Sequence, residues 1–266
     1  MTLPLRGHFL SDLHLFSRRS AAMSIAPKIV EAASNSHTMV LGGDIFDFKW
    51  STHPSLDRSV DVGIAWLEGL IGSNPQCSFY YLLGNHDAHP RFVSELERLA
   101  LRQPRLEWQR YVLRIRECVF LHGDIVDCEP CHTILDEKRK LQENKTQPKP
   151  YLHVLYDLVV RARLHRVAMH LAIRQKKVLN RLNQYLKLVQ LDASHGVRDV
   201  YFGHTHLVVD AVKYAGLTFH NGGASIHGLP FRIIETRLQS MTRSKHIEDP
   251  TPEDPQHSGD RWGYVS

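Results

Sequence analysis

Residues 39–47 read Met39-Val40-Leu41-Gly42-Gly43-Asp44-Ile45-Phe46-Asp47. An apolar run that ends in two glycines predicts a buried strand followed by a tight turn. Asp44 then stands at the strand end, where open α/β sheets bind their ligands and where glycine lets the backbone approach them closely. Because Gly-Asp after a strand is common, this block indicates a site only if the rest of the chain supplies partners.

Four further blocks supply such partners, each at the end of an expected strand. In an extended segment the side chains at i and i+2 share a face, so each pair with this spacing can converge on one ion. The blocks are Asp12 and His14 after the strand Arg6–Leu10, Asn85, His86 and Asp87 after Ser78–Leu83, His122 after Cys118–Leu121, and His204 and His206 after Val197–Phe202.

The side chains at these strand ends are carboxylates, one amide and imidazoles, without a thiolate. This mixture suits Mn²⁺, Fe²⁺ or Zn²⁺, among which we expect Mn²⁺, and it is too rich in nitrogen for Mg²⁺ or Ca²⁺ alone. Two such ions need a shared carboxylate and together activate a water for in-line attack on phosphorus. The candidate ligands are Asp12, His14, Asp44, Asn85, His122, His204 and His206.

The remaining apolar pattern predicts an α/β chain. A helix over Ala21–Ala33 between the first two strands makes a βαβ unit with a crossover. Further helices are expected over Leu56–Ile71 and near Phe92–Leu101. The second half is rich in strands, with a hairpin of Glu107–Ile115 and Cys118–Leu121 and later strands over Val208–Lys213, Leu217–Phe219 and Phe231–Ile234.

A basic helical insertion is expected over 129–195, inside a catalytic domain that covers 1–238. From 129 to 190 there are thirteen Lys or Arg and five Asp or Glu, a net charge of +8 in a chain whose total is +5. Apolar residues at helical spacing over 151–162 and 178–189 predict two amphipathic helices. They form either a pair packed on the sheet with a solvated basic face or a lid over the substrate. The tail, 239–266, has too few apolar residues to order itself.

Composition places the chain among ordinary globular proteins, with 266 residues and 42% hydrophobic residues. We expect a cytoplasmic protein, because the N-terminus shows no signal segment and four cysteines do not make a disulfide framework. Cys128 and Cys131 form a C-x-x-C motif, which indicates incidental loop cysteines, an extra zinc site or a redox pair. The 18 histidines favour metal or phosphate chemistry.

Taken in order, D-x-H, G-D-x-x-D, G-N-H-D, the His122 block and G-H-T-H resemble the calcineurin-like metallophosphoesterase superfamily over about residues 5–236. The resemblance implies a four-layer α/β/β/α sandwich of two mixed sheets with a helical insertion. It also implies two metal sites and a catalytic pair, in which His86 stabilises the phosphoryl group or protonates the leaving oxygen and Asp87 orients His86. One ion is bound by Asp12, His14, Asp44 and His206, and the other by Asp44, Asn85, His122 and His204.

Within the superfamily the chain resembles most the UDP-2,3-diacylglucosamine hydrolases, pyrophosphatases of lipid A synthesis. The likeness is carried by Gly43-Asp44-Ile45-Phe46-Asp47, by His122-Gly123-Asp124 and by the basic insertion before Gly203-His204-Thr205-His206. Those enzymes carry arginine where this chain has His86, so their arginine contact is absent. The resemblance implies an anionic nucleotide-linked lipid substrate and peripheral contact of the insertion with the inner face of the membrane.

Other functions use the same metals. A nuclease or cyclic-nucleotide phosphodiesterase needs a continuous basic patch with aromatic side chains for the bases, and Tyr151, Tyr156 and Tyr185 instead follow the helical apolar pattern. We therefore place nucleic acid below a phosphorylated small molecule or nucleotide-lipid as partner. A phosphomonoesterase acting on proteins or metabolites is a further alternative. A non-enzymatic metal-binding scaffold predicts missing ligands, and none is missing.

Overall fold

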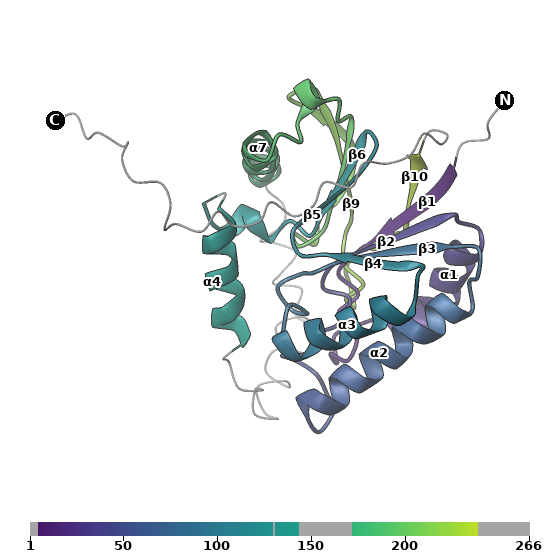
Figure 1. Ribbon diagram of the computed structural model, residues 1–266. Coiled ribbons are helices and arrows are strands. Elements are labelled where there is room, and N and C mark those ends of the chain that lie inside the picture. Colours follow the sequence, from purple (N-terminus) through teal and green to yellow (C-terminus); the bar gives the residue numbers. More distant parts are fainter. Residues whose placement is uncertain (1–4, 130, 144–171, 239–266) are drawn as a thin grey trace, which may run out of the picture.

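Two five-stranded sheets lie face to face at the centre of the protein (Figure 1). The computed structural model describes residues 5–129, 131–143 and 172–238. The first sheet has the order β10-β1-β2-β3-β4, in which β1 to β4 are parallel and β10 is antiparallel to β1. Its strands are β1 (Leu5–Leu10), β2 (Thr38–Gly42), β3 (Ser78–Leu82), β4 (Leu106–Gln109) and β10 (Ile234–Leu238).

The second sheet has the order β5-β6-β7-β9-β8 and is also mixed. Strands β6, β7 and β9 run parallel, while β5 and β8 pair antiparallel with β6 and β9. Its strands are β5 (Val112–Ile115), β6 (Cys118–Leu121), β7 (Asp199–Phe202), β8 (Val208–Tyr214) and β9 (Leu217–Gly222).

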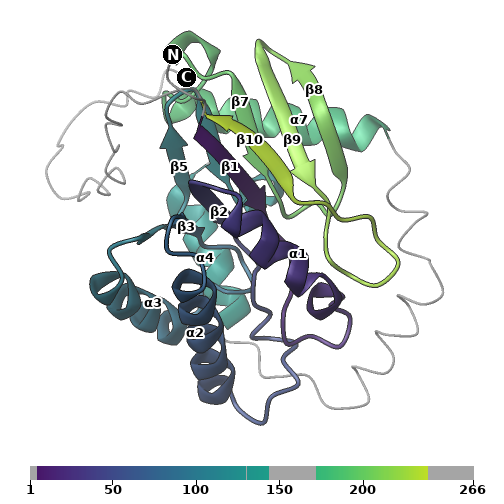
Figure 2. The ribbon, with the colours of Figure 1, turned by 90° about the vertical axis from the view of Figure 1, so that its right-hand side faces the viewer.

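Helices cover the outer faces of both sheets (Figures 1 and 2). The first sheet carries α1 (Ala22–Ser34), α2 (Leu56–Gly72) and α3 (Pro90–Arg102). On the side of the second sheet lie α4 (His132–Glu143) and α7 (Ala172–Leu188). Two short 3₁₀ turns, η1 (Asp124–Asp127) and η2 (Ala193–His195), complete the described elements. No helix in these ranges combines the length and apolar character needed to cross a membrane.

Three apolar clusters hold these layers together. Val40 of β2 points between the sheets, whereas Met39 and Leu41 pack under the helices of the first sheet. Because both faces of β2 are buried, its sequence is continuously apolar rather than alternating. Between the sheets, Phe9 of β1 meets Phe120 of β6 and Tyr201 of β7, with ring centroids 5.9 and 5.8 Å apart. The expected four-layer α/β/β/α sandwich is therefore confirmed.

The structure corrects two of the expected elements. Glu107–Ile115 is not one strand, because the chain leaves the first sheet at Gln109 and enters the second at Val112. Arg110 and Tyr111, between them, both bind the Asp136 carboxylate of α4. The last strand starts at Ile234, although Phe231 makes an isolated bridge with Gly223.

The helices of the insertion are confirmed only in part. The helix expected over 178–189 is α7, which packs Leu179, Leu182 and Leu186 on the second sheet. The helix expected over 151–162 lies outside the described residues. Helix α4 was not expected, and it is fixed by Arg139, whose buried guanidinium donates to both oxygens of Asp124.

Candidate metal centre

The candidate ligands follow β1, β2, β3, β6 and β7, so the strand ends of both sheets meet at one place. Five of them have left-handed backbone conformations, which cost a non-glycine residue about 1–2 kcal/mol. Strain of this kind concentrates where a fold must aim side chains at a ligand. The five residues and their φ angles are Asp12 at 54°, His14 at 48°, Asp44 at 52°, His204 at 64° and His206 at 57°.

Glycines allow the two buried carboxylates to sit close to neighbouring backbone. A Cβ added to Gly84 would lie 2.2 Å from Asp44 Oδ1, and one added to Gly203 would lie 2.3 Å from Asp12 Oδ2. No side chain fits at either position without displacing the carboxylate. The glycines of G-N-H-D and G-H-T-H therefore have a direct steric role beside Asp44 and Asp12.

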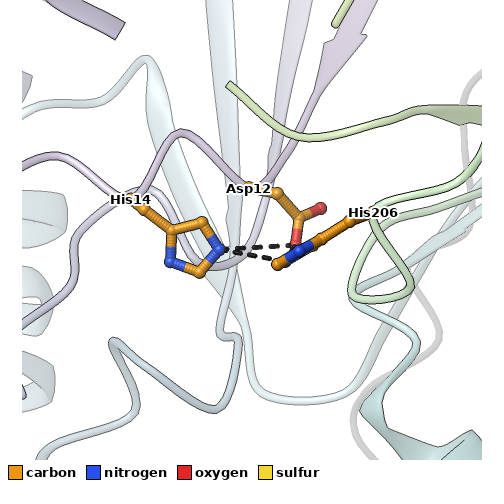
Figure 3. A group of neighbouring side chains, drawn as sticks. All are labelled: Asp12, His14 and His206. Carbon is orange, nitrogen blue, oxygen red and sulfur yellow. Dashed lines mark hydrogen bonds and ion pairs between the residues drawn. The ribbon is translucent and has the colours of Figure 1, made fainter. Parts of the chain in front are cut away.

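The first group of ligand atoms joins Asp12 and His14 with His206 (Figure 3). The Nε2 atoms of His14 and His206 face each other 3.1 Å apart. Asp12 Oδ1 lies 3.5 Å from His206 Nε2 and 4.0 Å from His14 Nε2. Burial lowers the pKa of His14 to about 4, and Arg19 acts in the same direction. The His14 ring is therefore neutral and keeps a lone pair for a ligand.

The second group joins Asp44, His122 and His204, with Asn85 between the two rings. His122 Nδ1 donates to the Gly42 carbonyl at 3.0 Å, so a neutral ring has its lone pair on Nε2. That lone pair points at Asn85 Oδ1, 3.2 Å away, and at Asp44 Oδ2, 3.3 Å away. His204 Nδ1 approaches the same Asn85 oxygen at 2.9 Å.

A divalent cation fits this donor set. Imidazole nitrogens, carboxylates and an amide oxygen converge on a buried position that only positive charge can satisfy. Although burial favours a neutral ring, the Asp44 carboxylate raises the pKa of His122 to about 10. The negative charge of Asp44 that favours a proton on His122 also favours a metal ion in place of that proton. Asp44 links this group to a third one, with His14 and His86.

His86 is oriented by Asp47, which corrects the expectation for Asp87. His86 Nδ1 lies 2.9 Å from Asp47 Oδ1, and the other Asp47 oxygen accepts from Arg19 at 3.1 Å. The described hydrogen bonds of Asp87 are instead with the Gly84 and Ile45 amides and the Tyr81 hydroxyl, from which it accepts. Asp87 therefore stabilises the backbone of the loop and does not orient the His86 ring.

Sequence reasoning missed three contributors to this region. Asp47 was part of a quoted motif without an assigned partner, and Arg19 lies in a loop that carries no motif. Asp127 binds His204 Nε2 through Oδ2 at 2.9 Å, and its only signal is its place five residues after His122. Within the described ranges, no metal-binding group of three includes Cys128 or Cys131.

Comparison with known families settles the class. Residues 6–208 match the family model described as calcineurin-like phosphoesterase. The chain belongs to this family. It is a metal-dependent phosphoester hydrolase, and its Asp/His groups are consistent with a dimetal site.

Solved structures resemble the chain at low sequence identity. A dimetal phosphatase from Danio rerio is 12% identical, with 88% of this chain and 93% of that chain covered and a TM-score of 0.46. A second solved structure is 11% identical, with 89% of this chain and 100% of that chain covered and a TM-score of 0.43. Among curated proteins no match is found.

Proposed function

We propose that the enzyme cleaves a phosphodiester or pyrophosphate bond with two divalent ions, and that these ions are Mn²⁺. In this proposal Asp44 binds both ions, and the other ligands divide between them. Asp12, His14 and His206 complete the first site, while Asn85, His122 and His204 complete the second. The observation that carries the proposal is the convergence of the His122 and His204 nitrogens on Asn85 Oδ1 beside Asp44.

The bound ions would supply Lewis acidity toward the phosphoryl oxygens and toward the attacking water. The protein would hold the ligand side chains in position. Asp44 is held by the His86 amide, which donates to its Oδ1 at 2.8 Å and so restrains the orientation of the shared carboxylate. Asp12 is held in the same way by the Ser11 hydroxyl at 2.6 Å and by the His204 amide at 3.0 Å.

His86 is proposed to give a proton to the leaving oxygen or to hydrogen-bond the phosphoryl group. Burial disfavours its charged form, but the Asp47 and Asp44 carboxylates outweigh burial and raise the pKa of His86. With Nδ1 engaged by Asp47, the other ring nitrogen is the one that can serve the substrate. This arrangement suits a general acid at neutral pH.

For the substrate we propose UDP-2,3-diacylglucosamine or a related nucleotide-linked lipid. Support comes from the motif resemblance and from two cations of the insertion beside the second ligand group. Lys138 of α4 donates to the Asp127 carbonyl, and Arg181 of α7 donates to the Val126 carbonyl. Both cations lie on the turn next to His204, where an anionic headgroup could meet them.

The test is product analysis by mass spectrometry. Metal-stripped protein is reloaded with Mn²⁺, Fe²⁺ or Zn²⁺ and incubated with UDP-2,3-diacylglucosamine, an aryl phosphodiester or an aryl phosphomonoester. Water added across the pyrophosphate must yield UMP and the acylated sugar 1-phosphate in equal amounts. We expect this pair of products, with the highest rate in Mn²⁺ and none in the metal-stripped sample.

The other outcomes separate the alternatives. Hydrolysis of the aryl diester without the nucleotide-lipid would keep the dimetal diesterase and reject the proposed substrate. Hydrolysis of the monoester alone would indicate a phosphomonoesterase. Equal rates with and without metal would contradict the dimetal mechanism itself.

A further inference from the structure

Asp127 contacts a candidate metal ligand from outside the ligand set. Its Oδ2 lies 2.9 Å from His204 Nε2, while the opposite ring nitrogen, Nδ1, faces Asn85 at 2.9 Å. A carboxylate only accepts hydrogen bonds, so the contact holds the His204 proton on Nε2. The lone pair of His204 is thereby directed from Nδ1 toward Asn85 and Asp44.

The turn that carries Asp127 is fastened to α4 and α7, the two helices of the insertion within the described residues. η1 begins after Gly123, whose φ of 106° only glycine adopts readily. Lys138 and Arg181 donate to the last carbonyls of the turn, and Arg139 binds Asp124 at its start with distances of 2.8 and 3.0 Å. The position of Asp127 therefore depends on α4 and α7.

We propose that Asp127 is a positioning residue that sets the affinity of the second metal site and links it to the insertion. A carboxylate bonded to the far nitrogen of a ligating histidine fixes the ring and raises its basicity, and its loss costs about 10- to 100-fold in metal affinity. The inference rests on the proposed dimetal function, since it assigns Asp127 to one of the two ions.

If Asp127 had only a structural role, its replacement would lower the free energy of unfolding of the metal-free protein. Its side chain is 61% exposed, and ion pairs at such positions contribute little to folding stability. Replacing it should therefore change metal binding without changing the free energy of unfolding of the metal-free protein. The chain also offers a matched control, because Asp199 Oδ1 binds His220 Nε2 at 2.8 Å. Asp199 lies at the start of β7, whereas His204 follows the end of that strand.

The experiment compares full-length wild type with Asp127→Ala, Asp127→Asn and Asp199→Ala. Mn²⁺ is titrated into each metal-stripped protein by calorimetry, and chemical denaturation measures metal-free stability. We expect Asp127→Ala to bind one of the two ions about 10- to 100-fold less tightly and the other ion unchanged. Asp127→Asn keeps an acceptor for the Nε2 proton and should lose less, while Asp199→Ala should bind both ions as wild type does.

A second measurement reports on the ring directly. In the Zn²⁺-loaded protein with ¹⁵N-labelled histidine, NMR should show the His204 proton on Nε2 in wild type and a weakened or exchanging proton in Asp127→Ala. Two ions bound with wild-type affinities by Asp127→Ala would overturn the inference while leaving the proposed function standing. A wild-type protein that binds fewer than two ions would instead contradict the proposed function, and the inference with it.

Discussion

The two halves of the metal centre are held in different ways. Asp12 and His14 are completely buried, and the His14 ring is enclosed by Asp47 and Arg19. In the other half His204 is 17% exposed and bonds to Asp127, which is 61% exposed. The first half is thus anchored by two core residues, with only His206 partly exposed at 26%. The second half combines the buried His122 with a turn near the surface that carries Asp127.

This difference shows which ion the insertion can influence. The contacts of the first half come from the loops after β1, β2 and β7, including the His204 amide, and none of its described hydrogen bonds goes directly to α4 or α7. The second half reaches both helices through η1. Changes in α4 or α7 should therefore alter the second site before the first.

The largest effect is expected from Asp44→Asn, because Asp44 belongs to both halves. An amide keeps the size of the side chain but removes the negative charge that both ions need. We expect both ions to be lost together in elemental analysis, and kcat to fall roughly 10³-fold or more.

Asp57→Asn provides the control, since Asp57 is 74% exposed and pairs only with the surface residue Arg91 among its described contacts. It should retain both ions and full activity. An Asp44→Asn protein that keeps one ion at wild-type affinity would show that the two halves do not share this carboxylate.

An intermediate effect is expected from His86→Asn, which removes the proposed acid between the two halves. Both ions should remain bound, and kcat should fall roughly 10²- to 10⁴-fold, the usual contribution of a positioned acid. Asp47→Asn should lower kcat less, because His86 then keeps a neutral partner at Nδ1. The measurement is kcat together with metal content.

Asp87→Asn separates the two carboxylates that could serve His86. Asp87 accepts from two amides and a buried tyrosine, so its replacement should mainly lower the free energy of unfolding and should have less effect on kcat. A greater loss of kcat in Asp87→Asn than in Asp47→Asn would reverse the assignment of the partner of His86.

Most of the fold and the ligand set could be predicted from local sequence. Buried parallel strands are apolar on both faces, and each ends at a polar block with glycine, so strand ends such as Asp44 and Asn85 were visible without coordinates. The backbone strain at these positions follows from the same need to aim side chains at one point. Local patterns therefore carried the information for the strands, the helices and the ligand positions, whereas the helix–sheet–sheet–helix layering was implied by the family resemblance.

What could not be predicted depends on contacts between distant segments. Asp47 and His86 are 39 residues apart, and nothing local distinguishes Asp47 from Asp87 as the partner of the ring. Asp127 acquires its role only when η1 packs against His204, 77 residues later. The crossing from β4 to β5 was missed because Arg110 and Tyr111 continue the extended pattern while changing sheets.

The smallest effect on activity is expected from Arg139→Met, which loosens the attachment of η1 without changing a proposed metal ligand. Arg139 is 2% exposed, binds both oxygens of Asp124 and donates to the Leu83 and Arg110 carbonyls. Methionine fills much of the same space but leaves the Asp124 carboxylate buried without a cation, which costs about 3–5 kcal/mol. We expect this loss in urea denaturation of the metal-free protein.

The activity of Arg139→Met and a matched double variant complete this test. Because the ligands stay in place, kcat at 25 °C should fall less than about tenfold, and any loss of metal affinity should concern the second ion only. Arg139→Met with Asp124→Leu removes both charges, so it should recover at least about 1 kcal/mol relative to the single variant. Equal loss of affinity for both ions in Arg139→Met would mean that the turn supports the whole centre, and the distinction between its two halves would fall.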